Sequence, residues 1–106
     1  MHAKTIQRFA ALIVLAAATW PLGGCGYPEV SPRAYEISQA LYSVCNQKSA
    51  ERLPVVEELI EKSLADGSLA EREGKWLNEI VAAGENGDWE SAAREARRIM
   101  ADQAGR

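Results

Sequence analysis

The chain has 106 residues, of which 47% are hydrophobic and 25% charged, and it carries a formal net charge of −3. This length allows one domain at most, and the apolar content is too high for a disordered chain. The acidic balance argues against a nucleic-acid partner, which needs a basic face, and two cysteines are too few for a disulfide scaffold or a four-ligand zinc site.

The first 25 residues differ from the rest of the chain. Lys4 and Arg8 give a cationic start, and no acidic residue comes before Glu29. Residues 9–20 form an apolar run that is shorter than the roughly 20 residues of a membrane-spanning helix, and such a run is typical of a signal-peptide core. Pro21 then ends the run.

The next four residues, Leu22-Gly23-Gly24-Cys25, resemble the lipobox of bacterial lipoprotein precursors. In that family small residues let an extended backbone enter the signal peptidase, and the cysteine thiol receives a diacylglyceryl group. The resemblance implies that Cys25 is lipidated and that the bond between Gly24 and Cys25 is cut. It also implies that the new amino terminus can be acylated, for example with palmitate.

This processing would divide the chain into a signal peptide (residues 1–24), a short tether (25–30) and a single helical domain (31–106). The protein would be anchored in the bacterial cell envelope through the acyl chains on Cys25. Gly26 replaces the aspartate that retains many lipoproteins at the inner membrane, so in a two-membrane bacterium the resemblance implies the outer membrane. The tether spans roughly 20 Å at about 3.3 Å per residue, so we expect the domain to lie close to its membrane.

An ordinary cleaved signal peptide is the alternative. It would release a soluble exported helical factor, in which a disulfide between Cys25 and Cys45 could form in an oxidising compartment. In either case, removal of residues 1–24 takes away the single histidine, His2. The mature chain then has no Ser-His or Cys-His nucleophile pair, which favours a protein that is not an enzyme and needs no cofactor or small-molecule substrate.

The rest of the chain predicts helices and carries no strand signal. The first helix begins at an N-cap, Ser31, with Pro32 at the first helical position, and runs to about residue 47. The second occupies roughly residues 50–65, with Pro54 in or near its first turn.

The third helix is expected after the Asp-Gly pair at residues 66–67. Ser68 and Glu71 have the spacing of a capping box, which predicts its start. The Asn-Gly-Asp sequence at 86–88 makes the last turn, and the fourth helix runs to about residue 103. The predicted core faces are Ala34, Ile37, Leu41, Val44 and Cys45; Leu53, Val56, Leu59, Ile60 and Leu64; Leu69, Trp76, Leu77, Ile80 and Val81; and Trp89, Ala92, Ala93, Ala96, Ile99 and Met100. The short loops predict an all-α antiparallel bundle of about four helices.

Two local resemblances suggest further functions. Asp66-Gly67, with Glu73 after it, is similar to the second half of an EF-hand calcium loop, but Lys62 and Leu64 stand at the opening ligand positions and bring no oxygen. We therefore predict no metal site, and keep a divalent-cation sensor at Asp66 and Glu73 only as a hypothesis.

The second resemblance is to a single tetratricopeptide unit, which binds peptides in that family. It extends over residues 76–100, and the stretch 87–93 is similar to the opening of the family's second helix. No second copy of the pattern occurs at the repeat spacing, and a solenoid needs about three repeats for stability.

Three side chains of the first helix remain. Cys45 falls on the apolar face, which favours a buried thiol. Tyr35 and Tyr42 lie seven residues apart at the edge of that face, and if exposed they are the candidate partner surface. The sequence as a whole predicts a small envelope lipoprotein whose helical domain is structural or binds another envelope component or a second copy of itself.

Overall fold

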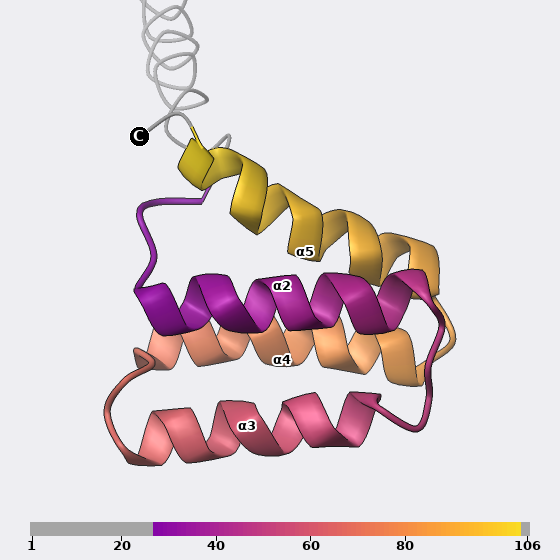
Figure 1. Ribbon diagram of the computed structural model, residues 1–106, viewed down its shortest axis with the longest axis horizontal. Coiled ribbons are helices and arrows are strands. Elements are labelled where there is room, and N and C mark those ends of the chain that lie inside the picture. Colours follow the sequence, from indigo (N-terminus) through magenta and orange to yellow (C-terminus); the bar gives the residue numbers. More distant parts are fainter. Residues whose placement is uncertain (1–26, 105–106) are drawn as a thin grey trace, which may run out of the picture.

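The computed structural model describes residues 27–104. The predicted signal peptide, the predicted cleavage position between Gly24 and Cys25 and the predicted lipidation site Cys25 lie outside the described residues. Within the described residues the chain forms no strand and four helices: α2 (Pro32–Asn46), α3 (Leu53–Ala65), α4 (Glu71–Glu85) and α5 (Trp89–Ala104) (Figure 1). The predicted all-α fold of about four helices is confirmed.

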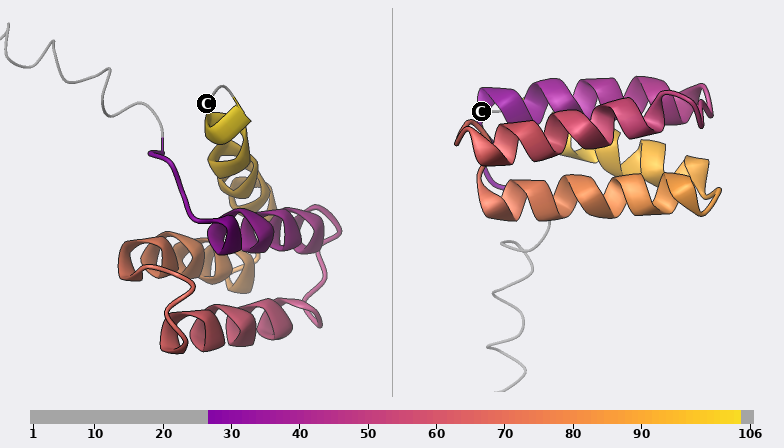
Figure 2. Two further views of the ribbon diagram at one scale, coloured as in Figure 1. Left: turned by 60° about the vertical axis from the view of Figure 1, so that its left-hand side comes forward. Right: turned by 90° about the horizontal axis from the view of Figure 1, so that it is seen from below.

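Consecutive helices run in opposite directions, so α2 and α4 point one way and α3 and α5 the other (Figures 1 and 2). The most extensive helix contact is between α2 and α5, whereas α3 packs on α2 and α4 and not on α5. The first residues of α2 and α4 therefore share one end of the bundle with the last residues of α3 and α5. We call this the proximal end, and the opposite end the distal end.

The core between the helices is apolar. Its fully buried residues are Ala34, Ile37, Leu41, Val44, Cys45, Leu53, Val56, Ile60, Leu69, Leu77, Ile80, Val81, Ala92, Ala96 and Ile99. All of them belong to the predicted core faces. Leu59, Leu64, Trp89 and Ala93 are only partly buried and pack around the edge of this cluster. Leu69 is buried from the loop before α4, because that helix begins two residues later.

The start of α2 is as predicted. The Ser31 hydroxyl accepts a hydrogen bond from the Ala34 backbone N–H at 3.1 Å, and Pro32 opens the helix. By contrast, α3 begins at Leu53 rather than near residue 50. Pro54 then lies in the first turn. Backbone N–H groups there have no carbonyl partner within the helix, so the absence of an N–H in proline costs no hydrogen bond.

The predicted capping box at the start of α4 is wrong. The N-cap is Ala70, and the carboxylate that accepts its backbone N–H at 2.9 Å belongs to Glu73. Ser68 stays in the loop because the Asp66 carboxylate accepts hydrogen bonds from its N–H at 2.8 Å and from its hydroxyl at 2.6 Å. That local turn satisfies the groups that a cap at Ser68 would have used.

Candidate functional site

The segment that follows the predicted lipidation site packs on α5. We call residues 27–30 the strap. The Tyr27 N–H donates to the Asp102 carboxylate at 2.7 Å, and the Val30 N–H donates to the Gln103 side-chain oxygen at 3.2 Å. The Gln103 amide in turn donates to the Pro28 carbonyl at 2.9 Å. Most of the segment predicted as a tether therefore lies against the proximal end of the bundle.

The side chain of Tyr27 extends this contact to α4 and α5. Its hydroxyl donates to the Glu95 carboxylate, and its ring meets the Trp76 ring edge-on, with centroids 5.1 Å apart. Burial, together with the hydrogen bond to Glu95, raises the pKa of the Tyr27 phenol well above its usual value. Tyr27 therefore stays neutral and keeps its donor proton at all physiological pH values.

Glu73 joins two helix starts at the same end. Its side chain is 3% exposed. Besides the Ala70 N–H, its carboxylate accepts the Ser31 N–H and the Ser31 hydroxyl, both at 2.8 Å. The N-termini of α2 and α4 carry partial positive charge, so one buried carboxylate stabilises both.

Asp66 and Glu73, the two residues of the cation-sensor hypothesis, have different hydrogen-bond partners. Glu73 is directed at Ser31 and Ala70, and Asp66 is occupied by Ser68. No group of three or more His, Cys, Asp or Glu side chains suited to hold a metal ion exists among residues 27–104. The structure therefore does not bring Asp66 and Glu73 together as ligands.

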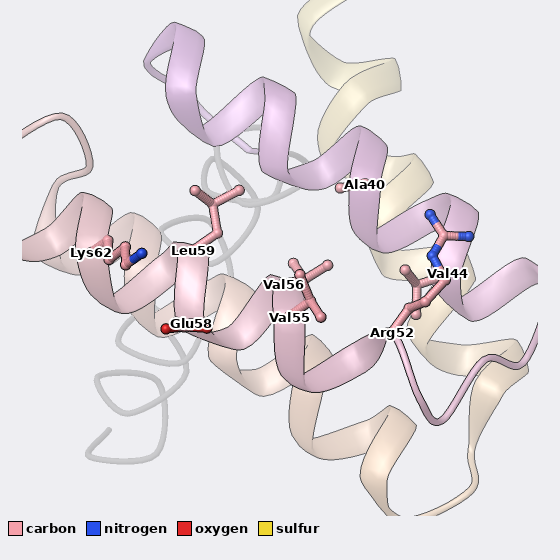
Figure 3. A pocket seen from close by; sticks show the side chains of 8 residues that line it. All are labelled: Ala40, Val44, Arg52, Val55, Val56, Glu58, Leu59 and Lys62. Atoms are coloured by element: carbon pink, nitrogen blue, oxygen red, sulfur yellow. The ribbon is translucent and has the colours of Figure 1, made fainter.

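An open groove of about 510 Å³ lies between α2 and α3 (Figure 3). Its lining residues are Ala40, Val44, Arg52, Val55, Val56, Glu58, Leu59 and Lys62. The floor is aliphatic, and Val55 is 64% exposed, an unusual fraction for a valine in a helix. Hence the groove presents apolar surface that nothing in the described chain covers.

Charged side chains flank this floor. Arg52, the N-cap residue of α3, and Lys62 near its end lie ten residues apart, which corresponds to about 15 Å along the helix axis. The Arg52 guanidinium donates to the neutral Gln47 side chain at 3.1 Å, and Lys62 has no ion-pair partner in the part of the chain that the structure describes. Glu58 lies between them along the helix and adds one negative charge.

Sequence reasoning missed this groove. The available signal was Val55, a large apolar residue of the second helix that lies outside the predicted core face of Leu53, Val56 and Ile60. An apolar side chain off the core face indicates an exposed apolar surface. The predicted partner surface lies elsewhere. Tyr35 is 37% exposed, while Tyr42 packs partly against the core.

The tyrosines and the groove are on different sides of α2. Because successive helical residues turn by about 100°, Tyr42 and Ala40 lie on opposite edges of the buried face. The structure therefore does not bring Tyr35 and Tyr42 into the groove, and they remain a separate candidate surface.

Cys45 is 1% exposed, as predicted from its place on the apolar face. Burial raises the pKa of its thiol, which disfavours the reactive thiolate. Cys45 lies thirteen residues into α2, about 20 Å along the axis from the proximal end where the strap docks. A disulfide requires Cα atoms less than about 7 Å apart, so a bond from Cys25 would require the strap to leave α5 or α2 to unwind.

Comparisons with protein-family models, curated proteins and solved structures found no match. The tetratricopeptide resemblance thus has no support from a family model. The helix pair that carries it, α4 and α5, is also not a self-contained unit, because α5 packs more extensively on α2. Among residues 27–104 no helix combines the length and the apolar character needed to cross a membrane.

Proposed function

We propose that this protein is a bacterial envelope lipoprotein, acylated at Cys25, whose helical domain is a non-catalytic module that binds another envelope component. The observation that carries the proposal is the docked strap. Tyr27, the first residue that the structure describes, follows the cysteine of the predicted lipobox with only Gly26 between them. An acylated Cys25 would therefore hold the proximal end directly against the membrane.

The anchor is chemically sufficient for this role. Each buried CH2 of an acyl chain contributes about 0.8 kcal/mol, and two or more chains hold a protein firmly where one does not. A domain fixed in this way works on partners that are close to the membrane surface. The proposed outer-membrane location follows from Gly26 after the cysteine and applies to a two-membrane envelope.

The groove between α2 and α3 is the surface proposed for the partner. Its aliphatic floor fits the apolar face of a helix, and its two flanking cations, Arg52 and Lys62, complement carboxylates on that helix. A helix with two acidic residues about 15 Å apart on one side, near positions i and i+11, has the matching spacing. We therefore propose an amphipathic helix with acidic flanks as the occupant.

The alternative of a soluble factor with a Cys25–Cys45 disulfide receives less support. It requires the Cys45 thiol, buried about 20 Å along α2 from the proximal end, to meet a residue that precedes the docked Tyr27 by only two positions in the chain. Measurement of the intact mass distinguishes the lipoprotein from the soluble, disulfide-linked factor. Expressed in a bacterial host with its own signal peptide, the chain is expected to start at Cys25 and to carry a diacylglyceryl group, with or without a third acyl chain. A Cys25→Ser variant supplies the unmodified control.

An unmodified mass that starts upstream of Cys25 would contradict the lipoprotein proposal. A mass that is lower by a further two hydrogen atoms, which two thiols lose when an oxidant converts them to a disulfide, would establish the disulfide-linked form instead. Either result would also remove the argument for a partner close to the membrane.

The groove is tested by placing a photo-crosslinking residue at Val55 in the lipidated protein in cells. The same residue at Ala82, an exposed position of α4, is the matched control. We expect a product from Val55 and not from Ala82, with the crosslinked peptide from an amphipathic helix that has acidic flanks. Lys62→Glu should reduce its yield. A product of twice the chain mass would identify a second copy as the occupant, and equal yields at both positions would exclude the groove.

A further inference from the structure

Four side chains gather where the strap meets the bundle. The rings of Tyr27 and Trp76 are in edge contact, the Arg72 guanidinium lies 5.6 Å from the centroid of Trp76, and that of Arg98 lies 6.0 Å from the centroid of Tyr27. We call these four residues the aromatic cluster. They come from the strap, α4 and α5, so the cluster exists only when the strap is docked.

The cluster is partly open to solvent. Tyr27 and Trp76 are half-buried, whereas Arg72 and Arg98 are exposed. Tyrosine and tryptophan have an apolar ring and a polar tip, and this combination concentrates them at the boundary between lipid chains and water. Arginine binds phosphate groups through its planar set of N–H donors.

The covalent chain fixes how far this cluster can be from an acyl anchor. Cys25 precedes Tyr27 by two residues, so their Cα atoms are at most about 7 Å apart. The headgroup region on each side of a bilayer is itself about 5–8 Å thick. If Cys25 is acylated, the aromatic cluster must therefore lie at the lipid surface.

We propose that the aromatic cluster rests in the phospholipid headgroup layer and sets the orientation of the bundle on the membrane. This inference depends on the proposed lipidation of Cys25 and adds to it a second, non-covalent lipid contact. The acyl chains hold the protein at the membrane, and the cluster determines which end faces the lipid.

Charge alone does not drive this contact. Carboxylates lie beside Tyr27 and Arg98. Glu95 accepts the Tyr27 hydroxyl and its carboxylate lies 3.6 Å from the Arg98 guanidinium, Asp102 accepts the Tyr27 N–H, and Glu79 is close enough to act on Tyr27. With both signs present, we expect the contact to form on zwitterionic vesicles and to change little when anionic lipid is added.

The second tryptophan of the mature chain provides an internal control. Trp89 opens α5 at the distal end, thirteen residues before Asp102, which corresponds to about 20 Å along the helix. In the proposed orientation Trp76 lies in the headgroup layer and Trp89 lies well above it. The Arg52 end of the groove then also faces away from the lipid, where a partner can reach it.

Quenching by brominated lipid tests this orientation. The mature lipoprotein is reconstituted into phosphatidylcholine vesicles with and without brominated acyl chains, as two single-tryptophan variants, Trp89→Phe and Trp76→Phe. Bromine should strongly quench Trp76 and shift its emission to shorter wavelength, and it should leave Trp89 almost unchanged. As a control, residues 25–106 of each variant with Cys25→Ser, produced without the signal peptide and its Trp20, should show little quenching with the same vesicles because the cluster alone is a weak contact.

Equal quenching of the two tryptophans, or none, in samples whose mass confirms acylation would overturn the proposed orientation while leaving the lipoprotein proposal intact. A sample whose mass shows no acyl group would overturn both. Circular dichroism of each variant checks that the helices are retained. If Trp76→Phe does not fold, the absence of quenching in a folded Trp89→Phe protein still overturns the contact between the cluster and the lipid.

Discussion

At the scale of single residues, Glu73 has the most demanding position in the molecule. A buried carboxylate is costly unless it is well hydrogen-bonded, and this one accepts three donors from Ser31 and Ala70. Burial raises the pKa of Glu73, but these hydrogen bonds outweigh burial, so the pKa lies below its usual value. The ionised form therefore stabilises the fold.

The first prediction follows from that direction. Glu73→Gln should lower the free energy of unfolding by about 2 kcal/mol at pH 7, because a neutral amide accepts these hydrogen bonds less strongly and its NH2 group faces donors. A lowered pKa contributes stability above the unfolded-state value near 4.3, and this contribution is lost as the pH falls through the folded-state pKa. Denaturation at pH 7 and pH 3 should show the wild-type advantage at pH 7 shrinking at pH 3. A pH-independent difference would contradict this account.

The second prediction concerns Lys48, the only non-glycine residue at positive φ among residues 27–104, with φ of 54°. It follows α2, where the N–H groups of Lys48 and Ser49 bond back to the Cys45 and Val44 carbonyls at 3.0 Å. Such a C-terminal turn favours glycine. Lys48→Gly should raise the free energy of unfolding by about 1 kcal/mol.

The control for Lys48→Gly is the reverse change at the end of α4. There Gly87 has φ of 83°, and Asp88 bonds back to the Ala83 carbonyl at 2.9 Å. Gly87→Ala should therefore destabilise the protein by a similar amount. If both substitutions shifted the denaturation midpoint in the same direction, backbone strain would not be the cause.

At the scale of the helices, α3 and α4 approach closely at Gly74. A Cβ atom there would lie 2.7 Å and 2.9 Å from the two terminal methyl carbons of Leu64. Gly74→Ala should therefore lower the free energy of unfolding by about 1–2 kcal/mol, although alanine is the better helix former. In a Leu64→Ala background the same change should be neutral or stabilising. Equal effects in both backgrounds would show that the contact does not limit the approach of the helices.

The helices differ in how far the sequence predicts them. In α2 the serine cap, the proline and the apolar period agree, so its bounds and its buried face were predicted almost residue by residue. The start of α4 was not. Two glutamates stand close together there, and the choice of Glu73 over Glu71 depends on Ser31, which is 42 residues away in the chain. A local pattern carries no information about that distant partner.

The candidate surfaces were less predictable for the same reason. The groove forms where α2 and α3 pack without covering Val55, and the aromatic cluster exists because the strap crosses to α4 and α5. Both depend on how elements pack, whereas sequence periodicity reports only which face of each element is apolar. Tyr35 and Tyr42 were predicted as a surface from one helix alone, and Tyr42 is partly covered.

At the scale of the whole molecule, the helices do not support one another equally. α2 contacts each of the other three helices, whereas α3 contacts only α2 and α4 and has the groove along one side. Fewer packed neighbours predict a lower free energy of local opening. Native-state hydrogen exchange should therefore show the amides of α3 opening at lower free energy than those at the centre of α2. Identical opening energies in both helices would mean that the bundle unfolds only as one unit.

The docked strap also implies an order of events during export. The bond expected to be cut, between Gly24 and Cys25, lies within three residues of Tyr27, whose N–H is bound to Asp102. A peptidase that takes its substrate in extended form needs the chain on both sides of that bond to be free. Under the proposed processing, the strap must therefore still be detached when the signal peptide is removed, and its contacts with α5 form only after that step.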